Sequence, residues 1–272
     1  LHFQLTLECS IMCKEYLLEM SKTLAVIPAR LASSRFPNKP LEEILGIPMI
    51  VHCFYRAKYC IGIDDLVVAT PDEEIFELCK KLDFEVCMTS DKHERATERT
   101  GEVVEIYEKQ NKYYENVILL QGDEPQLDPE VVDQLIERTE TSKNGIVNLI
   151  HCITEKDFND LNVVKAVINN KNEILNFSRT LIPGNPDKAF RQLGLIGFKT
   201  EFLQKFIDLD PSIHEVIESI DMMRFLDNDI KIEAFEVDQQ ILGVDEKQHI
   251  KLVETYLESD KYFLDYKNNF LK

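Results

Sequence analysis

The sequence predicts an α/β fold built on a mostly parallel sheet with helices on both faces. Short apolar runs alternate with segments of helical periodicity through the first half of the chain, and this alternation is typical of parallel sheets with crossover helices. The 272 residues contain no Gly/Ser linker, internal repeat or low-complexity tract. We therefore predict an N-terminal extension over residues 1–20 and one domain over 21–272, with an inserted subdomain at about 163–228.

Strands and helices of the first half follow from short local patterns. Thr23 to Ile27 is an apolar run that ends at Pro28, as a buried strand would. Pro71 precedes three acidic residues that suit a helix N-terminus, and Pro129 fits the first turn of another helix. The patterns predict strands at 23–27, 65–70, 84–88 and 116–120, and helices at 48–58, from 71, at 97–108 and at 129–139.

The second half has a different rhythm. Residues 163–177 predict a hairpin that turns at the Asn-rich segment 169–172. A strand is predicted at 193–198, and an edge strand at 229–237, where apolar and charged residues alternate. Helices are predicted from about residues 201 and 213 and within 245–272.

Composition excludes several classes of function. The chain has 31 Lys and Arg against 49 Asp and Glu, a formal net charge of -18, which argues against nucleic-acid or membrane-surface partners. No window reaches the roughly 18 apolar residues of a membrane span. The seven cysteines form no CxxC pair, and the histidines never pair with Cys at zinc spacing. We expect a cytoplasmic location with reduced thiols.

A basic loop follows the first predicted strand. Arg30, Arg35 and Lys39 lie within ten residues of one another, together with Ser33 and Ser34. Ligands of open α/β sheets bind outside the carboxyl ends of the strands, so this loop suits a polyphosphate. Neither GxxxxGK[ST] nor GxGxxG is present. The alternative is a solvated basic turn.

Two Gly turns deliver carboxylates. The strand at 116–120 leads into Gln-Gly-Asp-Glu-Pro, which presents Asp123, and Leu-Gly-Val-Asp presents Asp245. Each residue alone could be an ordinary turn or N-cap residue. Together with the basic loop they predict a site for Mg2+ and a triphosphate, because Mg2+ takes few protein carboxylates and completes its shell with phosphate oxygens and water.

Several motifs in this order resemble the 3-deoxy-manno-octulosonate cytidylyltransferases, or CMP-Kdo synthetases. The resemblance runs from about residue 24 to 256. It rests on Ile27-Pro-Ala-Arg, Ser34-Arg-Phe-Pro-Asn-Lys-Pro-Leu, Pro48-Met-Ile, Val68-Ala-Thr, Val86-Cys-Met-Thr, Leu120-Gln-Gly-Asp-Glu-Pro, Phe177-Ser-Arg and Gly243-Val-Asp.

The resemblance implies a glycosyltransferase-A-like fold, a homodimer, and transfer of CMP from CTP to a 2-ulosonic acid for lipopolysaccharide or capsule synthesis. It implies that the catalytic residues are Arg30, Lys39, Asp123 and Asp245, the last two holding Mg2+. The residues it implies for CTP are Arg30, Ser34, Arg35, Lys39, Thr97 and Arg99. Those it implies for the sugar acid are Gln121, Arg179, Gln192, Glu218 and Asp221.

The chain departs from the family in two places. Arg95 and Ala96 stand where the family has Ser-Gly, which affects recognition of the base and ribose. Gln192, Ile196 and Asp221 replace His, Tyr and Glu, so the acceptor could be a modified Kdo such as the 8-amino analogue or a sialic-acid-like ulosonate. A non-catalytic nucleotide-binding relative is the alternative from another class. An aldose 1-phosphate nucleotidyltransferase is disfavoured because the Gly-rich loop after the first strand is missing.

Two further residues carry separate expectations. His52 lies in an apolar helical pattern and is predicted to be a packed or capping imidazole rather than a ligand. Lys165 could be a charge on a strand surface or a ligand for the sugar carboxylate.

Overall fold

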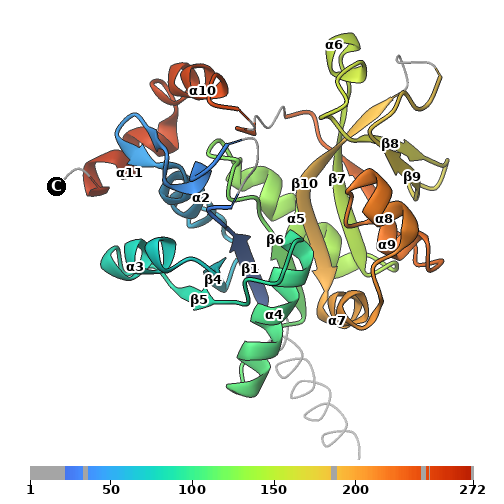
Figure 1. Cartoon of the computed structure of the whole chain (residues 1–272), viewed down its shortest axis with the longest axis horizontal. Helices are drawn as coiled ribbons and strands as arrows, with labels where there is room; N and C mark the ends of the chain where they lie inside the picture. The colour runs from blue at the N-terminus through green and yellow to red at the C-terminus, as the bar shows by residue number, and fades with distance from the viewer. Residues whose placement is uncertain (1–21, 33–35, 185–188, 240–242, 245, 271–272) are drawn as a thin grey trace, which may run out of the picture.

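The computed structural model describes residues 22–32, 36–184, 189–239, 243–244 and 246–270. Its central sheet has an α/β arrangement with helices packed on both faces (Figure 1). Across the sheet the strands follow the order β11 (Glu233–Glu236), β7 (Ile146–Cys152), β10 (Phe190–Lys199), β6 (Asn116–Leu119), β1 (Thr23–Pro28), β4 (Asp65–Thr70) and β5 (Val86–Met88).

Strand β1 lies at the centre and divides the core in two. It pairs in parallel with β4 and β6, and its four residues 24–27 are fully buried. Because successive side chains of a strand point to opposite faces, Ala25 and Ile27 join one apolar cluster while Leu24 and Val26 join the other. The helices of the first cluster are α2 (Met49–Ala57), α3 (Glu73–Lys81), α5 (Pro129–Thr141), α10 (His249–Leu257) and α11 (Lys261–Phe270). Those of the second are α4 (Ala96–Lys109), α7 (Thr200–Asp208) and α9 (Met223–Leu226).

Most predicted elements are confirmed, with shifts that have local causes. Helix α5 begins at Pro129 as predicted, and the Asp128 carboxylate accepts a hydrogen bond from the backbone N–H of Glu130. The predicted strand at 229–237 is shorter, because Asp229 has a φ of 58° that extended backbone does not allow. It does lie at the sheet edge, as β11. Strand β5 starts at Val86 rather than at residue 84.

Sequence patterns missed a seven-residue strand of the central sheet and left the direction of another strand open. Strand β7 was not predicted, although its residues Ile146 to Ile150 are all buried. Strand β10 runs antiparallel between β6 and β7. The other neighbouring pairs along this order are parallel, namely β6–β1, β1–β4, β4–β5 and β11–β7. The register of β10 shifts between Gln192 and Ile196. At this bulge the carbonyl group of residue 193 accepts a hydrogen bond from Asn148 in β7, and that of residue 194 accepts one from Gln121 in the turn after β6.

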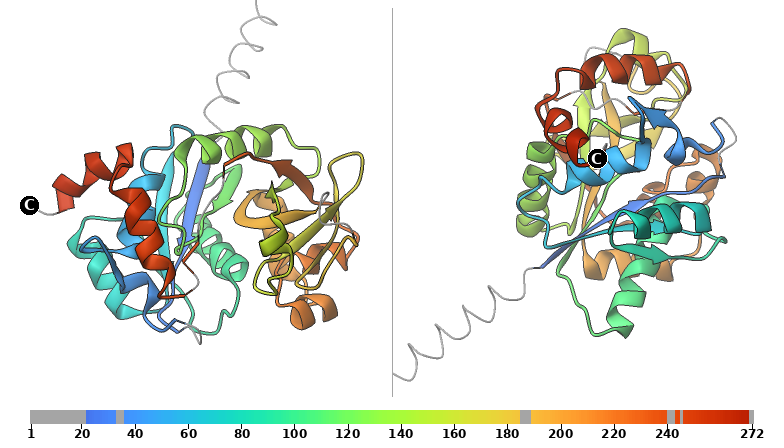
Figure 2. Two further views of the ribbon diagram at one scale, coloured as in Figure 1. Left: turned by 90° about the horizontal axis from the view of Figure 1, so that it is seen from above. Right: turned by 90° about the vertical axis from the view of Figure 1, so that its left-hand side faces the viewer.

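The predicted hairpin is β8 (Lys165–Ile168) and β9 (Ile174–Ser178), and β8 pairs with the start of β10. It stands with α8 (Ile213–Glu218) and α9 at one end of the molecule, and α10 and α11 lie at the other (Figures 1 and 2). The smaller elements are η1 (Lys39–Leu41), β2 (Glu43–Ile44), β3 (Ile47–Pro48) and α6 (Glu155–Phe158). Within the described ranges, no helix has both the length and the apolar character that crossing a membrane requires.

Candidate functional site

A cleft of about 860 Å³ opens where β1 and β6 end. Its lining comes from the loop after β1, the start of η1, the segment leading into α4, the turn after β6, and Ser219 after α8. Gly122 in the turn after β6 is required by space, because a Cβ there would lie 2.8 Å from the carbonyl oxygen of Pro28. The two strand ends therefore meet closely, at the edge where the sequence predicted a ligand site.

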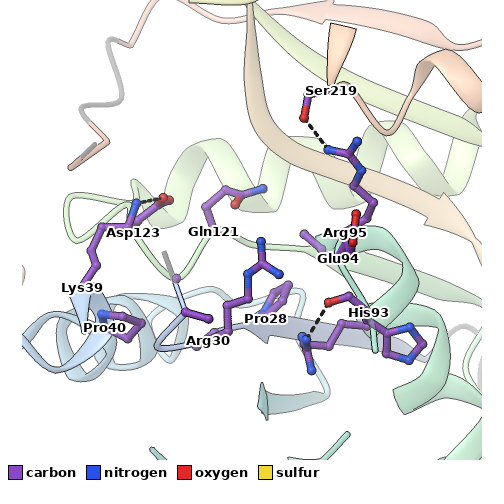
Figure 3. Close-up of a pocket in the computed structure, with 15 residues that line it drawn as sticks. Pro28, Arg30, Lys39, Pro40, His93, Glu94, Arg95, Gln121, Asp123 and Ser219 are labelled. Carbon is purple, nitrogen blue, oxygen red and sulfur yellow. Dashed lines mark hydrogen bonds and ion pairs between the residues drawn. The ribbon is translucent and has the colours of Figure 1, made fainter. Parts of the chain in front are cut away.

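Lys39 and Asp123 form an ion pair at one end of this cleft. The Lys39 Nζ lies 2.5 Å from the Asp123 Oδ2, and the two side chains are 15% and 30% exposed. Figure 3 shows the pair on one side of the cleft, with Arg30 and Gln121 between it and Arg95. Both side chains remain accessible. Lys39 can therefore pair with a phosphate oxygen instead of Asp123, and Asp123 can bind a metal ion instead of Lys39.

Arg99 also lines the cleft, but its guanidinium holds the loop before α4. Its Nη1 donates to the Thr89 hydroxyl at 2.5 Å and to the Ser90 carbonyl at 3.0 Å, and its Nη2 donates to the His93 carbonyl at 3.1 Å. Burial and then the nearby charge of Arg30 lower the pKa of Arg99. Two neighbouring guanidinium groups create a local positive potential in an acidic protein, which favours an anionic ligand.

The loop after β1 is held in place by Asp72, a residue that the sequence suggested only as part of a helix start. The Asp72 carboxylate accepts a hydrogen bond from the backbone N–H of Leu31 at 2.7 Å and makes no capping bond to its own helix. Helix α3 accordingly begins at Glu73. No local pattern predicts this contact, because the two residues are 41 positions apart.

Gln121 is positioned by the bulge in β10. Its Nε2 donates to the Gly194 carbonyl at 2.9 Å. A Cβ at position 194 would lie only 2.4 Å from the Gln121 Cγ, so Gly194 makes room for this side chain in the cleft wall. The predicted sugar-binding residue Gln121 is therefore in the cleft.

Four other predicted residues are engaged with one another rather than lining the cleft. Thr97 donates from its N–H and its hydroxyl to the Asp221 Oδ2, at 3.3 and 2.8 Å, and burial raises the pKa of Asp221. Arg179 donates from its backbone N–H to the Glu218 Oε2 at 2.9 Å. The cleft lining contains none of the four among the described residues.

Gln192 and Ile196 of β10 are also not among the residues that line this cleft. The Gln192 Nε2 donates to the Asn148 Oδ1 at 2.6 Å, and Ile196 is 4% exposed in the second core cluster. Three predicted site residues, Ser34, Arg35 and Asp245, lie outside the described residues.

The expectation that Lys165 is a charge on a strand surface is wrong. The residue is fully buried, and its Nζ donates to the carbonyl groups of Asp160, Val163 and Arg179 at 2.5, 2.9 and 3.0 Å. An ammonium group has three donors, and all three are used here. Lys165 therefore fixes the backbone of β9 where it leads to Arg179.

Comparison with known proteins shows the family of this chain. The cytidylyltransferase family profile matches residues 24–232. The mitochondrial 3-deoxy-manno-octulosonate cytidylyltransferase of Arabidopsis thaliana is 35% identical over 87% of this chain and 83% of its own length. The enzyme of the same name from Helicobacter pylori strain G27 is 38% identical over 84% of this chain and 95% of its own. The chain belongs to the 3-deoxy-manno-octulosonate cytidylyltransferase family.

Solved structures agree with this membership. A CMP:2-keto-3-deoxy-manno-octonic acid synthetase in complex with CTP superposes with a TM-score of 0.79 at 32% identity, covering 88% of this cytidylyltransferase and 99% of the other chain. A glucose-1-phosphate thymidylyltransferase from Bacillus anthracis, described as putative, has a TM-score of 0.64 at 16% identity and shares the fold alone. The glycosyltransferase-A-like nucleotidyltransferase fold is thus confirmed.

Proposed function

We propose that this cytidylyltransferase transfers CMP from CTP to the anomeric hydroxyl of 3-deoxy-manno-octulosonate, or of a close analogue, and releases pyrophosphate. Relatives that are 35% and 38% identical over most of this chain carry the name of this activity, and the similar synthetase structure holds CTP. The observation that carries the proposal is the cleft at the ends of β1 and β6, where Arg30, Lys39 and Asp123 meet in an otherwise acidic chain.

The residues of the cleft suit a displacement at the α-phosphorus. The acceptor oxygen forms a bond to phosphorus, the bond to pyrophosphate breaks, and the hydroxyl gives up its proton. Such a reaction depends on charge compensation and in-line positioning. Arg30 supplies a guanidinium at the centre of the cleft (Figure 3). When CTP binds, the Lys39 ammonium leaves the Asp123 carboxylate and pairs with a phosphate oxygen.

We extend the proposal to a Mg2+ ion held by Asp123 and Asp245. Carboxylate oxygen is a ligand that Mg2+ prefers, and Asp123 presents one in the cleft. The backbone N–H of Val244, the residue before Asp245, donates to the Asp123 carbonyl at 2.9 Å. Bound there, Mg2+ would neutralise charge on the phosphate oxygens.

Pyrophosphate release from CTP tests the function directly. The purified protein is assayed with Kdo, its 8-amino analogue and a sialic acid, in the presence of Mg2+ and after chelation. We expect turnover with one of the octulosonic acids and its loss on chelation. Pyrophosphate release from CTP at a comparable rate with the sialic acid as acceptor, or its absence with all three acids, would contradict the proposal. The ratio of kcat/KM for the first two acids decides whether Gln192, Ile196 and Asp221 retune the acceptor.

We propose further that the protein works as a homodimer in a reducing compartment such as the cytoplasm. Helix α8 exposes Ile213, Val216 and Ile217, which lie on one face at i, i+3 and i+4. A large exposed apolar row of this kind is typical of an interface.

The proposal of a reducing compartment rests on the cysteines. Those of the described ranges are all free thiols, and four of the five are buried.

A further inference from the structure

The turn that carries Asp123 lies between β6 and α5 and belongs to neither. The backbone N–H of Glu124 donates to the Gln121 carbonyl at 3.4 Å, and that of Leu127 donates to the Glu124 carbonyl at 3.0 Å. Helix α5 then begins at Pro129. Because two local hydrogen bonds do not fix a loop relative to the sheet, the position of the Asp123 carboxylate depends on contacts from other elements.

A buried arginine of α2 holds the far end of this turn. The Arg56 Nε donates a hydrogen bond to the Leu127 carbonyl, across 71 positions of sequence, and the Arg56 side chain is 5% exposed. Arginine is almost never fully buried unless its charge is paired. Here its Nη1 donates to the Asp260 Oδ1 at 2.7 Å, and the guanidinium lies 5.1 Å from the centre of the Tyr262 ring. Arg56 therefore connects the turn to the start of α11.

Asp260 is itself held by the first turn of α11. Its Oδ1 also accepts a hydrogen bond from the backbone N–H of Phe263 at 2.8 Å. Helix α11 lies against α2 (Figure 1), and the Tyr59 hydroxyl just after α2 donates to the Asp265 carboxylate. The carboxylate that pairs with Arg56 is thus fixed by a packed helix.

Another C-terminal residue holds the near end of the turn. The backbone N–H of Val244 donates to the Asp123 carbonyl at 2.9 Å, and the Val244 side chain is fully buried. One such bond would leave the turn free to pivot about Asp123. The second bond, from Arg56 to the Leu127 carbonyl, removes that freedom. The two bonds together set the direction in which the Asp123 carboxylate points.

We propose that Arg56 is a positioning residue for Mg2+ binding. It keeps the Asp123 carboxylate at the place in the cleft where CTP binds. The inference rests on the proposed function, in which Asp123 holds the metal ion. Arg56 is not among the described residues that line the cleft, so it acts through the turn and touches neither substrate. Mg2+ demands near-ideal octahedral geometry with oxygen ligands at about 2.0–2.1 Å, so a small displacement of the turn weakens metal binding before it affects the acceptor.

The gain in CTP affinity on addition of Mg2+ tests this role. The Kd of CTP is measured by calorimetry, with Mg2+ and with a chelator, for wild type and Arg56→Gln. We expect the gain to be roughly 10- to 100-fold smaller in Arg56→Gln, as for other residues that orient a metal ligand, while the Kd in chelator stays within about threefold of wild type. Arg56→Lys, which keeps a cationic donor, should recover part of the gain. The acceptor KM of both variants should also stay within about threefold of wild type.

Two control variants separate positioning from stability. Lys58→Gln makes the same change of charge at the exposed position that follows α2. Tyr59→Phe removes the hydrogen bond to Asp265, another link to α11 that does not involve the turn. Both should keep the wild-type gain, and thermal unfolding identifies which variants fold. If Arg56→Gln does not fold, Asp260→Asn, which removes the charge that pairs with Arg56, should lose part of the gain.

A folded Arg56→Gln protein with the wild-type gain would overturn the inference. An acceptor KM that rises as much as the gain falls would also overturn it, because that result indicates a general loss of structure rather than a misplaced carboxylate. Wild-type protein whose CTP affinity does not respond to Mg2+ would reject the metal site of the proposed function, and the inference with it.

Discussion

Asp123 is the residue on which turnover should depend most. Its carboxylate is paired with Lys39 at 2.5 Å and remains 30% exposed to the cleft. We expect Asp123→Asn to release pyrophosphate at less than about a tenth of the wild-type rate, because charge neutralisation at the phosphate oxygens supplies several kcal/mol. Asp210→Asn, at an exposed position away from the cleft lining, is the matched control. A rate above that limit in Asp123→Asn would show that Asp123 does not hold the metal ion.

Burial and two hydrogen bonds determine the protonation state of the His52 imidazole. Its Nε2 lies 2.9 Å from the Ile44 carbonyl, which can only accept, so this nitrogen carries the proton. Its Nδ1 then accepts from the Tyr266 hydroxyl at 2.6 Å and links α2 to α11. Burial lowers the pKa of His52 to about 4. The predicted packed imidazole is confirmed, as a neutral one.

This shift predicts a loss of stability in mild acid. Between pH 6.5 and 4 the unfolded chain binds a proton at residue 52 that the folded protein does not bind, so the free energy of unfolding falls as the pH falls. The loss should reach about 3 kcal/mol at pH 4. Urea unfolding across this range should show a shallower pH dependence for His52→Gln than for wild type. Equal slopes in the two proteins would contradict the assignment.

At the scale of elements, the bulge in β10 decides where Gln121 lies. In Gly194→Ala the new Cβ would meet the Gln121 Cγ at 2.4 Å and its Nε2 at 2.8 Å, so the Gln121 side chain must move. We expect kcat/KM for the acceptor to fall by roughly 5- to 30-fold, as for one or two lost hydrogen bonds, with little change in CTP affinity.

The matched control for this change is Gly184→Ala, because nothing lies within 4 Å of a Cβ at position 184. Thermal unfolding of both variants shows whether a loss of activity comes from the site or from global instability. Unchanged acceptor kinetics in a folded Gly194→Ala protein would show that Gln121 does not contact the sugar acid.

At the scale of the whole molecule, the exposed face of α8 predicts self-association. Ile213, Val216 and Ile217 are 74%, 63% and 72% exposed. We expect a dimer by size-exclusion chromatography with light scattering, and a monomer for Ile217→Lys, because a buried unpaired charge opposes association. Leu252→Lys on α10, at the other end of the molecule, should remain a dimer. A monomeric wild-type protein would reject the proposed assembly.

The sequence by itself determined the kinds of element and the chemistry of the loops. Apolar runs and helical periodicity are local, so they predicted β1, β4, β6 and the helices of the first half near their observed bounds. The basic loop and the turn with Asp123 follow directly after β1 and β6. Since parallel strands bring their carboxyl ends to one edge, the sequence also predicted that Arg30, Lys39 and Asp123 would share a site.

Only the tertiary structure decided which of the remaining polar side chains face the cleft. A side chain's partner depends on residues far along the chain, such as Ser219 for Arg95, Asn148 for Gln192, and the carbonyl groups around Lys165. The insertion of β10 between β6 and β7 sets these distances, and no local pattern encodes it. A buried donor must find an acceptor wherever packing places one. For that reason Arg179 bonds to the end of α8 and does not line the cleft, whereas Arg95 does.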